Sequence, residues 1–447
     1  MTDISKLPRR RARLIPVACA ALAALLVALA PSPARAVLQI DITQGVTDPI
    51  PIAVVPFARA VPADGGFDVA AVVQHDLEGS GRFRALARSA MLSQPTRAAD
   101  VQASAWHSAG ADYAVVGRVS ADGAGGLAIE FDLVNLLTGQ RLGGQRITAN
   151  AATLRNGAHR VADFVYEKIL GTRGAFATRV AYVTVNGQPP TQRFQLVVAD
   201  ADGENAKVVL DSRQPIMSPA WSADGEWLAY VSFESRAAAI FVQQVRTGER
   251  RQVSARLGVN GAPAWSPDGK RLALTLSGSS GNLDIYVLEL ATQRLTRITD
   301  NPAIDTEPAW SLDGRSLYFT SDRAGGPQIY RVDLADPSRV QRISYGAAYN
   351  ARPRLSPDGR ELAYVTRDGS RFRIALQDLA TGAVRLLSNG SLDECPSFSP
   401  NGATLIYAST EGGRATLATI SVDGLVSQRL KSDQGDVREP VWGPFLP

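Results

Sequence analysis

The side chains that most often catalyse reactions or bind metals are sparse in this chain. Its 447 residues include three histidines, His75, His107 and His159, which fall on predicted helices with ordinary surface patterns. No two of them have the spacing of a metal-binding pair. The sequence has neither a Gly-x-Ser-x-Gly nucleophile elbow nor a Gly-x-x-x-x-Gly-Lys-Ser/Thr phosphate loop. We therefore expect that the protein is not an enzyme, and we interpret the histidines as structural or solvated.

Charged residues are concentrated instead at one place in a repeated pattern, directly before a proline. They are Asp305, Glu307, Arg352, Asp393, Glu394, Arg438 and Glu439. Each precedes the predicted innermost strand of a repeat, so they should surround one mouth of a central channel that docks a partner. Carboxylates gathered in this way could bind Ca²⁺, and the candidates are Asp305, Glu307, Glu394 and Glu439. The alternative is a solvated, salt-bridged rim without a cofactor.

A short recurring motif positions these residues. Its clearest copy is Pro263-Ala-Trp-Ser-Pro-Asp-Gly269. Related copies recur every 43 to 45 residues and begin at Pro219, Pro263, Pro308, Pro353, Pro396 and Pro440. Within the motif, Pro presets φ, Asp or Asn bonds its own backbone, and Gly supplies the positive φ of a hairpin turn. Apolar strands follow each turn, and this period is typical of the four-stranded blades of a β-propeller.

Two incomplete repeats predict how the array closes. The motif at Pro440 has no second strand after it, whereas the strand Arg179-Val-Ala-Tyr-Val-Thr184 has no motif before it. If the C-terminal strand completes the first blade, the array has no exposed sheet edge. We therefore predict a mainly β protein in which residues 175–447 form a six-bladed β-propeller with Trp-Ser-Pro-Asp-Gly repeats. The motif tryptophans should pack between blades, and Trp265→Ala should cost about 3–5 kcal/mol if the ring is fully buried.

Residues 1–36 are typical of a secretory signal peptide. A basic start is followed by an apolar run from Leu14 to Ala30 and by the small-residue cleavage sequence Ala34-Arg-Ala36. A membrane anchor is the alternative, but the apolar run of about 17 residues is short for a membrane span. Without this segment the chain has 41 Lys or Arg and 42 Asp or Glu. Its charge therefore gives no reason to expect nucleic-acid binding.

A tail and a smaller α/β domain are predicted before the propeller. The tail comprises residues 37–50 and the domain residues 51–174. Helices are expected at residues 68–77 and 101–109, and a third should run from its cap Thr153 to Leu170, with Gly171 ending it. Strands are expected at residues 52–57, 113–117, 127–133 and 145–148.

Several longer segments make the chain similar to a known family. They are Ile52-Ala-Val-Val-Pro-Phe57, Gly174-Ala-Phe-Ala-Thr-Arg-Val-Ala-Tyr182 and Asn260-Gly-Ala-Pro-Ala-Trp-Ser-Pro-Asp-Gly269. With an α/β domain ahead of a terminal six-blade array, the chain after residue 36 resembles the TolB family, the periplasmic components of bacterial Tol–Pal systems. The resemblance implies a non-enzymatic periplasmic adaptor that supports outer-membrane integrity and outer-membrane invagination during cell division.

The resemblance also implies two partner sites. The peptidoglycan-associated lipoprotein Pal would bind the propeller mouth, at Met217, Ser218, Asn260, Gly261, Ala262, Asp305, Thr306, Glu307, Arg352, Asp393, Glu394, Arg438 and Glu439. The C-terminal domain of TolA would add to the tail as a strand, at Val37, Leu38, Gln39, Ile40, Asp41, Ile42 and Thr43. Neither nucleic acid nor a small-molecule substrate is implied. The protein is expected to be a monomer that is peripheral to the outer membrane through Pal.

One residue of the mouth departs from the family pattern. Val259 stands where relatives have a polar histidine ahead of Asn-Gly-Ala-Pro, which bears on the detailed contacts with Pal. The alternative function is a propeller module that binds carbohydrate or peptidoglycan. Aromatic residues would then be expected at the mouth, where this sequence has acidic and small residues.

Overall fold

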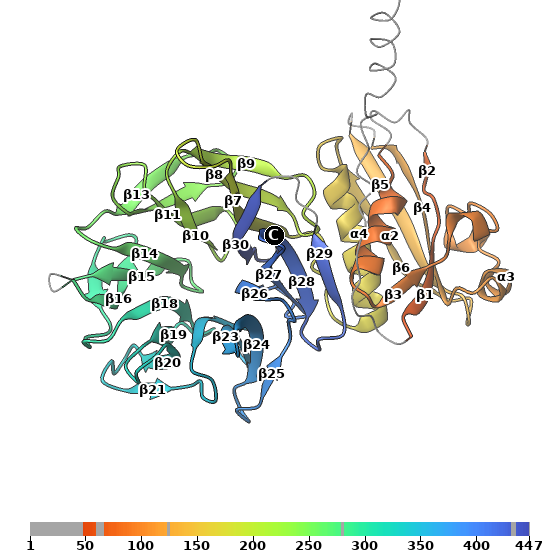
Figure 1. The fold of residues 1–447 in the computed structure, drawn as a ribbon. Helices are drawn as coiled ribbons and strands as arrows, with labels where there is room; N and C mark the ends of the chain where they lie inside the picture. The colour runs from red at the N-terminus through yellow and green to blue at the C-terminus, as the bar shows by residue number, and fades with distance from the viewer. Residues whose placement is uncertain (1–47, 60–66, 123–125, 279–280, 431–434, 447) are drawn as a thin grey trace, which may run out of the picture. The chain divides into compact units, whose positions relative to one another are not determined.

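The computed structural model describes residues 48–59, 67–122, 126–278, 281–430 and 435–446. The predicted signal peptide and the tail residues predicted to bind TolA lie outside these ranges. The described residues belong to one unit, in which an α/β domain is followed by an array of antiparallel sheets (Figure 1). No helix in the described ranges is long and apolar enough to cross a membrane.

The α/β domain is built on a sheet with the strand order β3-β1-β4-β5-β6, and the short β2 also pairs with β4. The strands are β1 (Ile50–Val54), β2 (Ala58–Arg59), β3 (Phe83–Ala85), β4 (Tyr113–Ala121), β5 (Leu127–Asn135) and β6 (Arg141–Ala149). Successive residues around β1 face opposite sides of the sheet. Ile52 and Val54 belong to one hydrophobic core, and Ala53 and Val55 belong to the other. Both faces of β1 are therefore buried.

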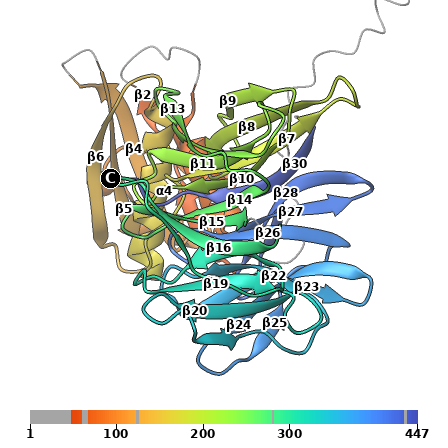
Figure 2. The same ribbon diagram turned by 90° about the vertical axis from the view of Figure 1, so that its left-hand side faces the viewer.

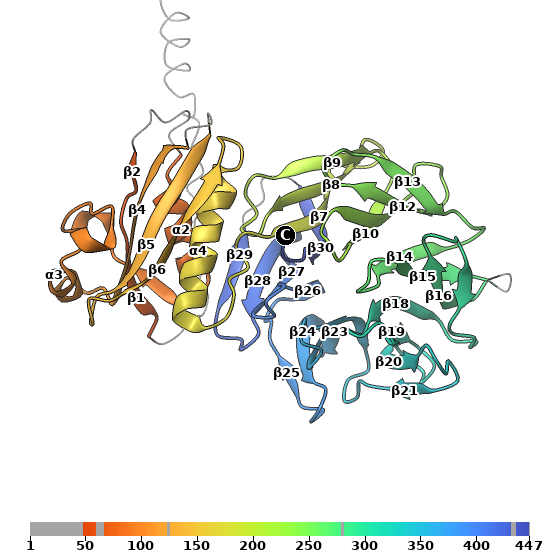
Figure 3. The same ribbon diagram turned by 180° about the vertical axis from the view of Figure 1, so that it is seen from behind.

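Helices cover the two faces of this sheet. They are α2 (Val69–Gly79), α3 (Ala103–Ser108), α4 (Leu154–Leu170) and the short η1 (Arg88–Ala90) and η2 (Ala98–Asp100). Figure 3 shows α2 and α4 side by side, and α3 packs against the opposite core. The predicted helices are confirmed: Asp68 caps α2 by accepting the Ala71 N–H at 3.0 Å, and Gly171 ends α4 with φ 76°. Thr153 precedes α4 but makes no capping bond to it.

The three histidines lie on these helices, and one of them is not on the surface. His107 is exposed and His75 is half-buried, whereas His159 on α4 is only 1% exposed. The predicted surface position is therefore wrong for His159. The cause is tertiary, because α2 packs against α4 and places Asp76 within hydrogen-bond distance of the imidazole.

Strands β7 to β30 form four-stranded units that follow one another around a ring, seen from the side in Figure 2. One unit has the order β30-β7-β8-β9 and contains β7 (Arg179–Asn186), β8 (Arg193–Asp200), β9 (Lys207–Ser212) and β30 (Asp436–Trp442). The next units contain β10 (Ile216–Trp221), β11 (Trp227–Ser232), β12 (Ala239–Gln244), β13 (Arg250–Ser254), β14 (Asn260–Trp265), β15 (Arg271–Ser277), β16 (Leu283–Glu289) and β17 (Leu295–Arg297).

The remaining units follow in chain order. They contain β18 (Asp305–Trp310), β19 (Ser316–Ser321), β20 (Gln328–Asp333), β21 (Val340–Arg342), β22 (Asn350–Leu355), β23 (Glu361–Asp368), β24 (Arg371–Asp378), β25 (Val384–Leu386), β26 (Leu392–Phe398), β27 (Thr404–Glu411), β28 (Arg414–Ser421) and β29 (Ser427–Leu430). A single parallel bridge between Phe372 and Leu392 joins β22–β25 to β26–β29. Within each unit the neighbouring strands are antiparallel, as short hairpin turns require.

The motif tryptophans pack between neighbouring units. Trp310 is 8% exposed, belongs to a core with Ile285 of the preceding unit, and donates its Nε1–H to the Ala264 carbonyl at 3.0 Å. Trp265 is only half-buried, and its Nε1 has no hydrogen-bond partner in the described part of the chain. Trp265 is therefore not fully buried. We expect Trp265→Ala to lower the free energy of unfolding by less than the roughly 3–5 kcal/mol of a fully buried ring.

Candidate partner-binding face of the propeller

Each innermost strand has a shift of register directly before the proline of its motif. The residue before the proline has a φ between 44° and 59°, a left-handed conformation that side chains rarely adopt. These residues, which we call the bulge ring, are Ser218, Ala262, Glu307, Arg352, Cys395 and Glu439. Bulges of this kind re-aim side chains. Here they line a shared cavity of about 50 Å³.

Arg352 joins the acidic members of the bulge ring. Its Nε lies 3.0 Å from Glu307 Oε1, and its Nη2 lies 3.7 Å from Glu439 Oε1. The backbone N–H of Arg352 also donates to Glu307 Oε2 at 3.0 Å, and its guanidinium contacts the Cys395 sulfur. One cation therefore holds carboxylates from two different units, which offsets the strain of the left-handed residues.

Cys395 is a buried thiol beside Arg352. Burial raises the pKa of this thiol to about 12, so it stays protonated at neutral pH. The chain from residue 37 contains no other cysteine. We expect this chain to react very slowly with a chromogenic disulfide reagent at about pH 8 while folded, and rapidly once unfolded in urea. Equal labelling rates in both states would contradict the buried position.

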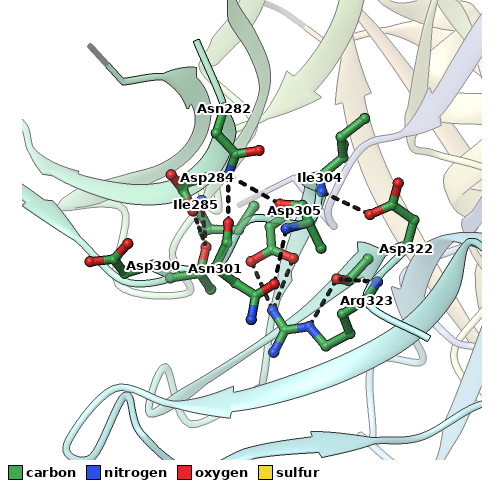
Figure 4. A network of polar contacts seen from close by, with 12 residues as sticks. Asn282, Asp284, Ile285, Asp300, Asn301, Ile304, Asp305, Asp322 and Arg323 are labelled. Atoms are coloured by element: carbon green, nitrogen blue, oxygen red, sulfur yellow. Dashed lines mark hydrogen bonds and ion pairs between the residues drawn. The ribbon is translucent and has the colours of Figure 1, made fainter. Parts of the chain in front are cut away.

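Asp305 belongs to a separate network, shown in Figure 4. Its side chain is buried, and its two carboxylate oxygens accept hydrogen bonds from Arg323 at 2.8 and 2.9 Å. The preceding residue is fixed as well, because the N–H of Ile304 donates to Asp322 Oδ1 at 2.8 Å. These bonds hold the start of β18 in one position, and Glu307 follows two residues later in the bulge ring.

Three of the four carboxylates proposed for a calcium site are engaged by arginines, and the fourth, Glu394, is exposed. Glu307 and Glu439 pair with Arg352, and Asp305 pairs with Arg323. In the described ranges these residues do not form a group of ligand atoms close enough to hold a metal ion. In this part of the rim, arginines therefore already compensate most of the candidate carboxylates.

The residues predicted to contact Pal differ in exposure. Asn260, Asp305 and Asp393 are buried, and their side chains form hydrogen bonds within the protein. Asn260 Oδ1 accepts the N–H of Arg256 at 3.0 Å, and Asp393 Oδ2 accepts the N–H of Gly390 at 2.9 Å. These three side chains position the rim and cannot touch a partner without local opening. The exposed or half-buried residues are Met217, Ser218, Gly261, Ala262, Thr306, Glu307, Arg352, Glu394, Arg438 and Glu439.

Exposed apolar side chains lie at the same ends of the innermost strands. This apolar arc comprises Met217, Leu257, Val259, Ile304 and Tyr345, which are 42% to 98% exposed. Its members stand at or shortly before β10, β14, β18 and β22, which are neighbours around the ring. Apolar groups gathered beside a polar rim are typical of protein-binding surfaces.

Sequence reasoning missed three members of this arc, Leu257, Ile304 and Tyr345. A signal was present, because each is a large apolar residue in a loop that precedes an innermost strand, where polar residues are the norm. The motif pattern alone cannot show that these loops are neighbours, since about 45 residues separate one repeat from the next.

Comparison with known proteins covers both parts of the chain. The TolB beta propeller domain family matches residues 166–446, and the TolB amino-terminal domain family matches residues 38–142. The Tol-Pal system protein TolB of Thioalkalivibrio sulfidiphilus is 49% identical over 94% of this chain and 97% of its own length. That of Methylococcus capsulatus is 51% identical over 91% of this chain and 94% of its own length.

A solved structure is similar over nearly the whole chain. The crystal structure of TolB from Acinetobacter baumannii has a TM-score of 0.83 and 40% sequence identity, and it covers 92% of this chain and 100% of that chain. These matches confirm the mainly β fold, with an amino-terminal domain and a propeller domain. The chain therefore belongs to the TolB family.

Proposed function

We propose that this protein is a non-enzymatic periplasmic adaptor of the Tol–Pal system that binds Pal at its propeller mouth. The apolar arc is the observation that carries this site. Its five side chains are exposed at or before the innermost strands that carry the bulge ring, and the carboxylates of that ring are already held by Arg352. A partner would therefore meet a preformed surface, which lowers the entropy cost of binding.

Apolar and charged side chains make up the proposed contact surface. Met217, Val259 and Ile304 offer apolar area for an interface core, while Glu394 and Arg438 are exposed charges suited to a rim. Aromatic stacking platforms for sugars are scarce here, since Tyr345 is the single exposed aromatic residue of the arc. This composition favours a protein partner over the alternative of carbohydrate or peptidoglycan.

We further infer that residues 175–447 form six blades and that β30 completes the first of them. The pairing of β30 with β7 supports this closure, as do the four-stranded sheets β10–β13, β14–β17 and β18–β21. The preceding α/β domain would comprise residues 51–174. The ring would then be closed by β30, and we expect a monomer that reaches the outer membrane through Pal.

The second partner in this proposal is the C-terminal domain of TolA, which would bind the tail at residues 37–43 by strand addition. The tail alternates apolar and polar residues at its start, as a half-buried strand requires. Because the tail and the mouth are different parts of the chain, one protein could engage both partners. Such a bridge would support outer-membrane integrity and invagination during cell division.

Calorimetry with two forms of the protein tests both sites together. We expect the chain from residue 37 to bind the soluble domain of Pal from the same organism with micromolar or tighter affinity, and to bind the C-terminal domain of TolA. A chain that begins at residue 44 should keep its affinity for Pal within about twofold and lose TolA, because only the added strand is missing.

The two binding reactions can fail independently. If the shortened chain still binds TolA, the tail is not its site, while the Pal site stands. If neither form binds Pal, the mouth is not a Pal site. Titration with peptidoglycan fragments then decides whether the alternative function holds.

A further inference from the structure

One face of α4 carries charged residues spaced four apart. Arg155, His159 and Asp163 stand at i, i+4 and i+8, so they lie on the same side of the helix. Arg155 Nε lies 3.0 Å from Asp200 Oδ2, and its terminal nitrogen pairs with Asp202. Asp200 ends β8, and Asp202 follows in the turn to β9. This face therefore joins the α/β domain to the unit that contains β7, β8 and β9.

His159 lies between two carboxylates and has one ring nitrogen without a hydrogen bond. Its Nδ1 lies 2.7 Å from Asp76 Oδ2 on α2. Its Nε2 is buried, has no hydrogen-bond partner among the residues that the structure describes, and lies 3.6 Å from Asp200 Oδ2. An aspartate that orients a histidine from behind, with the other ring nitrogen free, is the usual arrangement of a metal-bound histidine.

The distance between His159 Nε2 and Asp200 Oδ2 also suits a shared metal ion. At 3.6 Å it exceeds the length of a hydrogen bond, which is about 2.7–3.2 Å. Two ligand atoms on a tetrahedral Zn²⁺ with bonds of about 2.1 Å lie roughly 3.4 Å apart. Ligand atoms of Asp76, His159 and Asp202 lie within 4.8 Å of one another. No other group of this kind occurs in the described ranges.

Carboxylates outnumber the guanidinium groups around His159. The carboxylates of Asp76, Asp200 and Asp202 lie near Arg155, and Arg179 is the cross-strand neighbour of Asp200. A cation on the neutral imidazole would add to the compensation of these acids. Buried charges are costly unless they are compensated.

Asp163, the other acidic residue on this face of α4, already accepts hydrogen bonds from the backbone. Burial raises the pKa of Asp163 to about 6, and its carboxylate accepts the N–H groups of Phe176 at 2.7 Å and Ala177 at 3.2 Å.

We propose that this cluster binds one divalent cation of the Zn²⁺ class. His159 Nε2 and the carboxylates of Asp200 and Asp202 are the ligands, and Asp76 positions the imidazole. One imidazole with two carboxylates suits Zn²⁺ better than the all-oxygen preference of Ca²⁺ or Mg²⁺. The bound ion would tie α4 to the turn between β8 and β9, and so stiffen the connection between the α/β domain and the propeller.

The test uses the chain from residue 37, stripped with EDTA, dialysed, and titrated with Zn²⁺ against a chromophoric chelator. We expect one equivalent to bind. His159→Gln should weaken the affinity at least 100-fold because the ligand nitrogen is lost. Asp76→Asn should weaken it about 10–100-fold, the usual effect of losing an outer carboxylate. His107→Gln is the matched control, since His107 is exposed on α3, beside Asp112, and should leave Zn²⁺ binding unchanged.

A second readout requires no variant. Co²⁺ added to the stripped wild-type protein should give the intense visible absorption of a four-coordinate site, and one equivalent of Zn²⁺ should abolish it. If no equivalent of either metal binds, the proposal is overturned, and His159 is a buried imidazolium between Asp76 and Asp200. If His159→Gln, shown to be folded by circular dichroism, binds Zn²⁺ like the wild type, the ion lies elsewhere and the proposal is also overturned.

Discussion

Replacing Val259 by aspartate is expected to weaken the binding of Pal at least 100-fold. Val259 is 44% exposed, and it lies in the apolar arc between Leu257 and the buried Asn260. Burying a valine side chain in an interface contributes about 1.5–3 kcal/mol. A carboxylate buried there without a partner costs several kcal/mol more. A loss of about 2.7 kcal/mol already corresponds to 100-fold in affinity, which calorimetry at fixed ionic strength measures directly.

Leu312 provides the matched control for this prediction. It is 60% exposed, but it lies in the turn after β18, at the opposite end of that strand from Ile304. Leu312→Asp introduces the same charge and should leave Pal binding within about twofold, as a substitution outside the contact surface does. Val259→His introduces the residue type that the family resemblance leads us to expect at this place, and it should retain binding. Wild-type affinity in Val259→Asp would remove the apolar arc from the site.

Arg352→Met is expected to lower the free energy of unfolding by about 2–3 kcal/mol. The substitution keeps an apolar chain of similar length but removes the cation between Glu307 and Glu439, whose side chains are 22% and 15% exposed. Removing one partner of a fully buried ion pair costs about 3–5 kcal/mol, and the remaining exposure reduces that amount here. Urea unfolding of the chain from residue 37 measures the change.

Further substitutions show whether the unpaired carboxylates cause this loss. Adding Glu307→Gln and Glu439→Gln to Arg352→Met should recover at least half of it, because neutral amides need no cation. Arg360→Met is the control, since the Arg360 side chain is 85% exposed and its ion pair with Asp358 spans 3.8 Å. It should change stability by less than about 0.5 kcal/mol. A triple variant no more stable than Arg352→Met would exclude charge repulsion as the cause.

The repeated turns and the helices could be predicted from sequence because their causes are local. In the motif turn, Ser266 Oγ accepts the N–H of Arg271 at 2.9 Å, and Asp268 Oδ1 accepts the N–H of Lys270 at 3.1 Å. These bonds connect residues at most five apart. Asp68 likewise caps α2 through a bond to the third residue beyond it, Ala71. Local residue types therefore determined these turns and the start of α2.

Part of the candidate site was also present in the sequence. Residues before each motif proline were predicted to gather at one mouth, and Glu307, Arg352 and Glu439 do line a common cavity. Their exposure was not predictable in the same way. Asp305 and Glu307 are only two residues apart, yet the first is buried against Arg323 and the second reaches the cavity.

Only the tertiary structure decided how residues from distant repeats and from the two domains are paired. Arg352 meets Glu307 across 45 positions, and its left-handed backbone is one that its sequence does not favour. His159 meets Asp76 across 83 positions and then faces Asp200 of the propeller. Such contacts depend on which units become neighbours when the chain folds. That outcome reflects the packing of the whole chain, and no short stretch of sequence encodes it.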